Sequence, residues 1–315
     1  MIANCYVESF ILNRMTLKQL SILREIARQR LVMSSAAAVL YTLQPGISRQ
    51  IHLLEEELGV VLLRRRRNRV LGFTDVGKSV LGSAQRLLFE AENIKLMAQD
   101  AREEQVGKLS VVTTHLHARY TLAQPIAEFA QRHPGIQLHL LQTDAGSIAK
   151  LVESGEADIA VSTERERGSS SLLVLPGPPL RRSLIVPRAH PLAHARRVTL
   201  KDIARYPLVG YNPASRSGEL MADALRAHGI DAQFVLSASD ADVIKTYVLQ
   251  GLGIAIVPSI ALEAETAKGL RVIDVTHLFP KSVIAVSLRP GVYVRAFVRE
   301  FIEMVVPGVK VPVLE

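Results

Sequence analysis

The feature that most constrains this chain is the segment 34–63, SSAAAVLYTLQPGISRQIHLLEEELGVVLL, which predicts two short helices joined by a tight turn. Small residues at 36–40 suit a helix that packs closely against a neighbour, and residues 41–43 interrupt its period. A second helix follows, because Pro45 suits a first helical turn, where no backbone N–H is needed. Its apolar residues recur at steps of three and four and predict one buried stripe: Ile47, Ile51, Leu54 and Leu58.

The opposite face of the second helix carries short or forked hydrogen-bonding side chains. Such side chains are what contacts to base edges and phosphates in a DNA major groove require. The residues of this region that we expect to contact DNA are Ser34, Ser35, Thr42, Gln44, Pro45, Ser48, Arg49 and His52. An ordinary helical hairpin with a solvated outer face is the alternative at this point.

Five arginines stand among residues 64–69, RRRRNR, directly after the helix pair. A charge run is usually a solvated surface, but its position here suits a wing that follows phosphates beside the groove. Each phosphate neutralised by such a wing releases counterions, so affinity falls steeply with salt. The arginines Arg64, Arg65, Arg66 and Arg67 complete the expected DNA contacts.

Composition limits the other classes of function. The chain has 38 Lys and Arg against 30 Asp and Glu, a formal charge of +8, which fits an anionic partner without identifying it. The only cysteine, Cys5, excludes an intramolecular disulfide and a cysteine-based zinc site, so a reducing compartment, the cytoplasm, is expected. The longest apolar run, 252–262, is interrupted and too short to span a bilayer, so we expect no membrane association.

The pattern divides the chain into parts. Residues 1–14 lack the features of a secretion signal and are expected to be a disordered leader. Three helices and a wing at 15–73 form the first domain. Residues 74–105 follow, where Thr74 suits an N-cap and a long amphipathic helix typical of a dimerisation arm begins. A helix laid on its own domain is the alternative.

From residue 107, short β-rich runs alternate with helices, which predicts an α/β fold with a largely parallel sheet. The expected strands are 109–112, 136–141, 159–162, 184–187, 208–211, 233–237, 254–257 and 284–288. We expect an effector domain at 106–315 with two lobes, lobe I at about 106–176 and 277–305 and lobe II at about 177–276. A ligand is then expected in the cleft between them, at strand carboxyl ends and helix N-termini.

Two groups of residues are candidates for that cleft. Thr113, Thr114 and His115 follow a strand and precede a helix, where hydroxyls and N–H groups converge and the helix dipole favours an anion such as sulfate or a carboxylate. Simple capping of the helix is the alternative. The second lobe is expected to contribute Tyr211, Ser215, Arg216, Ser239 and Asp240. Arg216 is a candidate counterion, with a solvated loop arginine as its alternative.

The segment 34–63 followed by RVLGFTDVGKSVL at 69–81 resembles the winged helix-turn-helix and linker helix of the LysR-type transcriptional regulators. The resemblance covers nearly the whole chain from Met15. Within that family, four stretches are similar to the CysB and Cbl branch. They are TTHLHARYTL at 113–122, ADIAVSTE at 157–164, DADVIKTYVLQGLGIAI at 240–256 and GLRVIDVTHLF at 269–279.

The resemblance implies a regulator with an N-terminal winged helix-turn-helix, a long linker helix and a two-lobed, periplasmic-binding-protein-like effector domain. It implies a homotetramer, a dimer of dimers, on double-stranded promoter DNA, with RNA polymerase as a candidate partner. The branch controls sulfur assimilation. The implied targets are sulfur-assimilation or sulfonate-use genes, and the implied effector is sulfate, thiosulfate, adenosine phosphosulfate or an O-acetylserine-like molecule. A regulator of an unrelated pathway, with a different effector, is the alternative.

In the branch, sulfate contacts fall at positions that match Thr114, Leu116, His117 and Thr163. This chain departs at two of them. Leu116 replaces the usual threonine and offers no hydrogen bond, and His117 replaces the usual glutamine, so its donors depend on its protonation. The loop 143–147, TDAGS, replaces the branch's more usual GSPTQ, and its aspartate would repel a second negative charge. The identity of the effector therefore stays open.

Other classes of protein fit less well. An enzyme would need a nucleophile with its base, paired carboxylates or a metal cluster, and none occurs at an informative spacing. His115 and His117 have no apparent third metal ligand, so we expect neither a catalytic nor a metal site, and no cofactor. A small-molecule-binding protein without DNA function would explain the cleft but would have no use for the arginine run.

Overall fold

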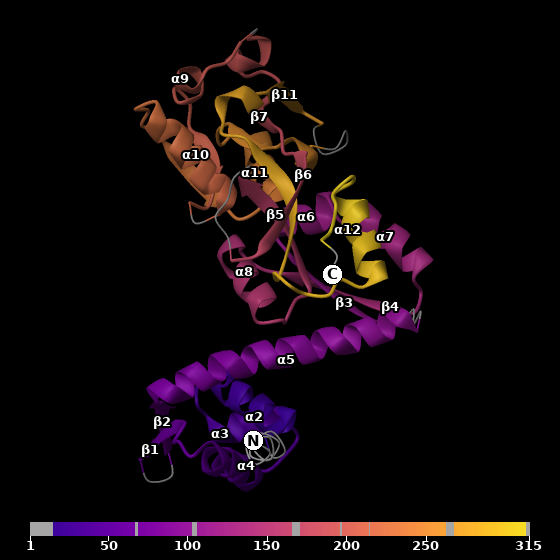
Figure 1. Cartoon of the computed structure of the whole chain (residues 1–315). Coiled ribbons are helices and arrows are strands. Elements are labelled where there is room, and N and C mark those ends of the chain that lie inside the picture. The colour runs from indigo at the N-terminus through magenta and orange to yellow at the C-terminus, as the bar shows by residue number, and fades with distance from the viewer. Residues whose placement is uncertain are drawn as a thin grey trace, which may run out of the picture. The chain divides into compact units, whose positions relative to one another are not determined.

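The computed structural model describes residues 15–66, 69–102, 106–165, 171–195, 197–213, 215–262 and 268–312 (Figure 1). The expected leader at 1–14 and Arg67 lie outside the described residues. The chain forms two compact units that divide between Gln99 and Asp100. None of the described helices is long and apolar enough to cross a membrane.

The N-terminal unit is built on the helices α2 (Leu17–Arg28), α3 (Met33–Val39) and α4 (Gln44–Leu58). Thr16 begins α2 with a capping box, since its hydroxyl accepts from the Gln19 N–H while the Gln19 side chain accepts from the Thr16 N–H. The fully buried side chains of the core include Leu23, Ile26, Ile47, Ile51 and Leu54. The predicted helix pair and its buried stripe are therefore present, with Leu58 half-buried at the helix end.

A two-stranded antiparallel hairpin forms the wing. Its strands are β1 (Leu63–Arg66) and β2 (Arg69–Phe73), paired from Leu63 opposite Phe73. The carboxylate of Glu55 on α4 accepts hydrogen bonds from the N–H groups of Leu62 and Leu63, at 2.8 and 3.0 Å. One helix side chain thus fixes where the hairpin begins.

The helix α5 (Asp75–Ala101) follows the hairpin. Thr74 acts as its N-cap, because its hydroxyl oxygen accepts from the Gly77 N–H at 2.9 Å. Ala84 and Leu88 of α5 are buried in the same core as α2 and α4. The middle of this helix therefore packs against the rest of the N-terminal unit.

The first sheet of the C-terminal unit has five strands in the order β4-β3-β5-β12-β6. These strands are β4 (Ile136–Gln142), β3 (Gly107–Thr113), β5 (Ile159–Arg165), β12 (Ser282–Leu288) and β6 (Leu173–Pro179). Successive residues point to opposite faces, so Val111 and Val112 enter two different cores. One face packs against α7 (Ala123–Arg132) and α12 (Ala296–Val305), which lie side by side, and the other against α8 (Ala145–Glu153) (Figure 1).

The rest of this unit is built on two smaller sheets. Three strands pair in the order β10-β7-β11, namely β10 (Ala255–Pro258), β7 (Arg182–Pro187) and β11 (Leu270–Asp274). A parallel pair, β8 (Leu208–Tyr211) and β9 (Phe234–Ala238), lies beside them through a bridge between Leu208 and Ile254. The helices here are α9 (Leu200–Ile203), α10 (Arg216–Ala227) and α11 (Ala241–Leu249).

In the two larger sheets of this unit, most strands run in one direction, as expected of a largely parallel sheet, but each of these sheets contains one reversed strand. β12 runs antiparallel to both β5 and β6, and β7 runs antiparallel to both of its neighbours. The reason is the path of the chain, which leaves the first sheet along β6 and returns to it along β12, while β7 enters the second sheet and β11 leaves it. Adjacent outgoing and returning strands must run in opposite directions.

Two strands were not expected from the sequence. β6 contains three prolines, LVLPGPP, which argue against a strand. The prolines are tolerated because β6 lies at the edge of its sheet, where a missing N–H matters less. β11 is also an edge strand, and its side chains are mostly exposed or half-buried. Edge strands lack the apolar run that marks a buried strand in a sequence.

Two glycines of α5 are expected to respond oppositely to alanine. A Cβ at Gly77 would overlap the carbonyl oxygen of Leu62, whereas a Cβ at Gly82 meets only the end of Arg86, at 3.9 Å. We expect Gly77→Ala to destabilise the N-terminal unit by about 1–3 kcal/mol and Gly82→Ala to stabilise it by up to about 1 kcal/mol. Thermal unfolding followed by circular dichroism measures both. Equal shifts of the same sign would contradict this packing of α5 against the hairpin.

Candidate functional site

The first candidate site is the exposed face of α4 together with the preceding turn. Gln44, Pro45, Arg49 and His52 are exposed, and Ser48 is half-buried. On α3 and in the turn, Ser34 and Thr42 are exposed and Ser35 is half-buried. The exposed side chains expected to contact DNA therefore share the surface around the beginning of α4.

The hairpin extends this surface. Arg64, Arg65 and Arg66 are exposed on β1, and Arg67 lies outside the described residues. The Arg65 guanidinium donates to the Ser48 hydroxyl at 3.3 Å and lies 3.5 Å from a carboxylate oxygen of Glu55. Arg65 therefore links the wing to the helix, and the arginines and the face of α4 form one basic surface.

The N-terminus of α4 is open. Its N-cap position is Leu43, which makes no capping hydrogen bond and whose exposed fraction is 78%. Serine, threonine, aspartate or asparagine normally satisfies the first N–H groups of a helix from this position. Pro45 has no N–H, and the N–H groups of Gly46 and Ile47 donate to the Leu43 carbonyl, so the first turn of α4 presents mainly the positive end of the helix dipole to solvent.

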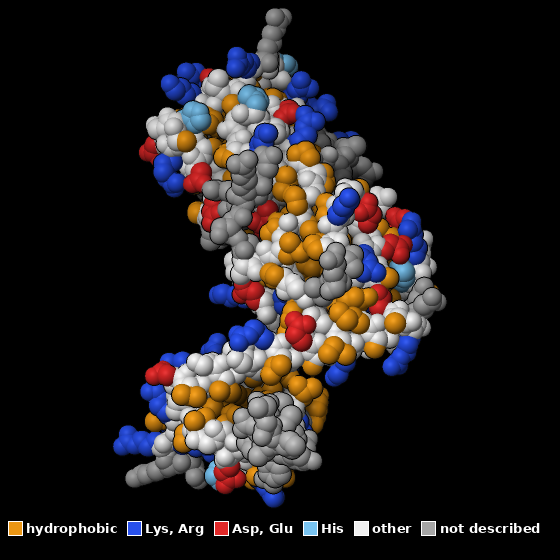
Figure 2. All heavy atoms as spheres, viewed as in Figure 1, with side chains coloured by type: hydrophobic (Ala, Val, Ile, Leu, Met, Phe, Trp, Pro, Cys, Tyr) orange, Lys and Arg blue, Asp and Glu red, His pale blue; other side chains and the backbone are white. Residues whose placement is uncertain are grey.

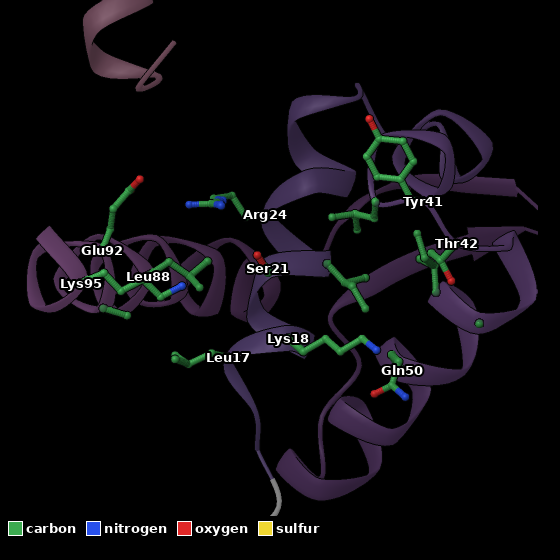
Figure 3. A pocket seen from close by; sticks show the side chains of 15 residues that line it. Leu17, Lys18, Ser21, Arg24, Tyr41, Thr42, Gln50, Leu88, Glu92 and Lys95 are labelled. Carbon is green, nitrogen blue, oxygen red and sulfur yellow. The ribbon is translucent and has the colours of Figure 1, made fainter. Parts of the chain in front are cut away.

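A pocket of about 640 Å³ lies elsewhere on the N-terminal unit. Figure 3 shows the side chains that line it, contributed by α2, the turn before α4, α4 and α5. They include apolar Leu17 and Leu88 and the charged ends of Arg24, Glu92 and Lys95. No residue expected to contact DNA lines this pocket except Thr42.

The second candidate site is a cleft of about 900 Å³ in the C-terminal unit. It is lined by residues at the carboxyl ends of β3, β4, β5, β8 and β9 and by the helices that follow them. Eight of the expected effector contacts line it: Thr114, His115, Leu116, Thr163, Tyr211, Ser215, Ser239 and Asp240. Arg216 begins α10, but its side chain lies outside the described part of the structure.

Several lining residues were not expected from the sequence. The polar ones are Gln142, Ser162, Glu164, Asn212, Ser217, Glu219 and Ser287, and the apolar ones include Ile148, Ala149 and Leu172. Gln142 and Asn212 stand at strand ends, Ser217 and Glu219 lie in the first turn of α10, and the others lie within strands or α8 or just before β6. The rule that ligands bind at the carboxyl ends of strands could have found the residues at strand ends and helix starts once the strands were ordered.

Thr113 and His117 do not line the cleft. The Thr113 hydroxyl is fully buried and donates to the carbonyl oxygen of Val161 at 2.7 Å, because its side chain points into the sheet and not toward the cleft. His117 is fully buried as well, with hydrogen bonds joining its Nδ1 to Thr121 at 2.9 Å and its Nε2 to Thr163 at 2.8 Å. Both residues therefore bond to β5, which borders the cleft, and do not line the cleft themselves.

Burial controls the charge of His117. It lowers the pKa of the imidazole from 6.5 to about 4, so the ring is neutral at physiological pH. Each ring nitrogen of His117 faces a threonine hydroxyl, which can donate or accept. His117 therefore orients the Thr163 hydroxyl at the cleft without bringing a positive charge.

The N-termini of four helices reach the cleft, and those of α8, α10 and α11 are each capped by the side chain of their N-cap residue. The Asp144 carboxylate caps α8 by accepting from the Ser147 N–H at 3.1 Å, and the Ser147 hydroxyl donates to it at 2.9 Å, which lowers its pKa. Asp240 caps α11 by accepting from the N–H groups of Asp242 and Val243. Ser215 caps α10 by accepting from the Gly218 N–H. These three helix starts are therefore satisfied by the protein itself, whereas α6, where the sequence predicted an anion site, begins at Thr114 without a side-chain cap.

An ion cluster joins α6 (His115–Tyr120) to α11 at one end of the cleft. The Asp242 carboxylate accepts from the Tyr120 hydroxyl at 2.6 Å and from Arg119 at 2.9 Å, and it pairs with buried Lys245 at 2.9 Å. Burial alone would raise the pKa of Asp242, but these hydrogen bonds and cationic charges outweigh it and hold the pKa below its usual value. These residues belong to the motifs HARY and DADVIK, which carried the resemblance to the CysB and Cbl branch in the sequence. Only the fold brings the two motifs together.

The buried imidazole predicts a pH dependence. The unfolded chain protonates His117 below its ordinary pKa of 6.5 and the folded chain only near 4, so stability is full above 6.5 and is lost as the pH falls toward 4. When the pH falls from about 7 to about 5, we expect the unfolding free energy of the wild type to decrease by about 2 kcal/mol more than that of His117→Gln. Urea unfolding followed by circular dichroism measures this difference. Parallel losses in the two proteins would show that His117 is not buried in its neutral form.

Comparisons with known proteins match both parts of the chain to one family. Residues 17–78 match the family described as "Bacterial regulatory helix-turn-helix protein, lysR family". Residues 102–309 match the "LysR substrate binding domain". The two matches together cover most of the chain.

Individual relatives are similar over nearly the full length. The chain is 39% identical to the HTH-type transcriptional regulator CysB of Burkholderia cenocepacia, over 96% of each chain. It is 38% identical to the HTH-type transcriptional regulator Cbl of Escherichia coli, over 94% of each chain. Among solved structures, the cofactor-binding domain of the Cbl transcriptional regulator superposes with a TM-score of 0.62 at 36% identity, covering 66% of this chain and 91% of that domain.

Proposed function

Since the chain belongs to the LysR family of DNA-binding transcriptional regulators, we propose that it controls sulfur-assimilation or sulfonate-use genes in response to a small effector. The family assignment confirms the resemblance, the fold class and the expectation that the chain is a regulator and not an enzyme. The observation that carries the sulfur pathway is the similarity to CysB and Cbl over nearly the whole chain. The proposed compartment is the cytoplasm.

The proposed DNA contacts follow from the basic surface of the N-terminal unit. The exposed face of α4 enters the major groove of promoter DNA, where Gln44, Ser48 and Arg49 reach base edges or phosphates. The exposed first turn of α4 faces a phosphate, which the positive end of the helix dipole favours. The arginines of β1 follow the phosphates beside the groove.

A salt titration tests the wing. We expect Arg64, Arg65 and Arg66 replaced together by alanine to flatten the dependence of log affinity on log salt by up to about 3, because each phosphate contact contributes roughly 0.9. Gel shifts with a promoter fragment, taken from upstream of this gene and its neighbours, measure the slope.

The matched control replaces three exposed arginines of the C-terminal unit, Arg181, Arg205 and Arg226, by alanine. This variant has the same net charge as the wing variant and should keep the wild-type slope. Equal slopes in the wing variant and the wild type would refute the proposed phosphate contacts of the wing.

The proposed assembly rests on α5. Leu87, Ile94 and Met97 are large apolar side chains of this helix, yet their exposed fractions are 49%, 66% and 38%. Their spacing of seven and three residues places them along one side of the helix. Figure 2 also shows hydrophobic side chains gathered on the visible face of the N-terminal unit. We propose that this side of α5 packs against a second copy, and that two such dimers form a homotetramer that contacts RNA polymerase.

Charge on the exposed side of α5 tests this assembly. We expect Leu87→Glu with Ile94→Glu to separate the dimer, because it buries two carboxylates in an apolar contact, while the single chain still folds since both side chains are largely exposed in it. Sedimentation measures the mass. Lys78→Glu, on an exposed side chain of the same helix, is the control and should leave the mass unchanged. An unchanged mass in the double variant would exclude α5 as the contact.

The effector is proposed to bind in the cleft of the C-terminal unit. The proposal is supported by the size of the cleft and by the match of this unit to a substrate-binding domain. Candidates are a sulfur-containing oxyanion, namely sulfate, thiosulfate or adenosine phosphosulfate, and an O-acetylserine-like molecule. These two kinds of ligand differ in charge, so the residues of the cleft can distinguish them.

A further inference from the structure

We propose that the effector carries a protonated amine, as an amino acid does, and that the Asp240 carboxylate holds this amine in the cleft. The inference rests on the proposed function, because it names the class of ligand for the same cleft. Three observations carry it: the charge of the lining, the occupied helix N-termini, and the surroundings of Asp240.

The lining of the cleft is acidic although the chain as a whole is basic. Four carboxylates line it, those of Asp144, Glu164, Glu219 and Asp240. The described lining residues include His115 but no lysine or arginine. A doubly charged oxyanion would lose its water here and face negative charge, which is unfavourable in a partly enclosed site. An ammonium group would be attracted by the same field.

Most of the groups that commonly bind an oxyanion are already engaged. The N-termini of α8 and α11 hold the carboxylates of Asp144 and Asp240, which occupy the places that an external anion would take. Leu116 has no donor, and the Thr163 hydroxyl is bonded to His117. Of the expected sulfate contacts, only Thr114, at the start of α6, therefore keeps a side-chain hydroxyl that is uncommitted to any described residue. A sulfate at α8 or α11 would have to displace the protein's own acceptors.

Asp240 has a surplus of negative charge. One of its oxygens accepts the two capping N–H bonds of α11, and within the described residues no lysine or arginine pairs with it. Its neighbour Asp242 differs, because Lys245 and Arg119 neutralise it. Ligand atoms of His115, Asp240 and Asp242 lie within 4.8 Å of one another. The two cations on Asp242 disfavour a divalent metal ion there, whereas a singly charged ammonium needs only Asp240 as its counterion.

The hydroxyls around Asp240 suit the rest of such a ligand. Ser239 precedes Asp240, and Thr114 lies on the opposite side of the cleft with no side-chain capping bond at α6. Both hydroxyls can donate to a carboxylate or a carbonyl oxygen. The ligand is thus a small molecule in which an ammonium and an acceptor oxygen lie a few bonds apart.

Binding measurements on the full-length chain test the class of ligand. The probes are L-amino acids and O-acetylserine, each compared with its N-acetyl counterpart, together with sulfate, thiosulfate and adenosine phosphosulfate. O-acetylserine and N-acetylserine are isomers that differ in whether the amine is free, and a mildly acidic buffer slows the conversion of one into the other. We expect at least one free amine to bind at least about tenfold more tightly than its N-acetyl counterpart, and the oxyanions not to bind.

Substitution of Asp240 tests the residue. We expect Asp240→Asn to weaken the binding of the amine ligand by about tenfold or more, because the acceptor of its ammonium group changes from a charged carboxylate to a neutral amide. Asparagine is as good an N-cap as aspartate, so α11 and the fold are kept. Asp144→Asn is the matched control, since it removes a cleft carboxylate that already caps a helix, and it should change the affinity by less than about threefold.

Several results would overturn the proposal. They are tight binding of an oxyanion or an N-acetyl compound, binding by none of the free amines, and unchanged affinity in Asp240→Asn. Loss of binding in Arg216→Ala but not in Asp240→Asn would assign the cleft to an anion. Gel shifts on the same preparations separate this failure from the larger one, because the proposed regulator fails only if the wild-type chain does not retain promoter DNA selectively.

Discussion

The buried ammonium of Lys245 is the group on which the geometry of the cleft depends. Its side chain is 4% exposed, and it has three oxygen partners, namely the Ala261 carbonyl at 2.7 Å, the Tyr120 hydroxyl at 3.0 Å and the Asp242 carboxylate at 2.9 Å. A buried cation is stable only when its charge and all its donors are satisfied. Tyr120 ends α6, which follows β3 of the five-stranded sheet, and Asp242 lies in the first turn of α11. The hydrogen bonds that satisfy Lys245 therefore fix the distance between the two sides of the cleft. A ligand beside Asp240 therefore binds next to the contact that holds these sides together.

The N-terminal unit depends on a comparable contact. Glu55 accepts from two backbone N–H groups at the start of the hairpin and pairs with Arg65, so one carboxylate positions the wing against α4. Among the described wing residues, Arg64, Arg66 and Arg69 are exposed. This division is useful for DNA binding, since one arginine orients the surface while the others are available to phosphates.

The two units concentrate opposite charges. The proposed DNA-binding surface carries the arginines of β1, whereas the cleft is lined by four carboxylates. The formal charge of +8 hides this separation, because it sums over both regions. Local charge density, and not net charge, sets the potential that a phosphate backbone or a small ligand meets.

The sequence by itself determined the local features of this protein. The stripe of Ile47, Ile51 and Leu54, the caps at Thr16 and Thr74 and the position of most strands follow from spacing and side-chain chemistry within a few residues. Eight of the residues that line the cleft were also predicted, because most of them stand at strand ends or helix starts. Only the tertiary structure decided the strand directions, the burial of Thr113 and His117, and the contact between Tyr120 and Asp242, which are 122 residues apart. These features depend on how distant segments pack, and a side chain at a strand end can turn toward a ligand or into the core without any change in the local pattern.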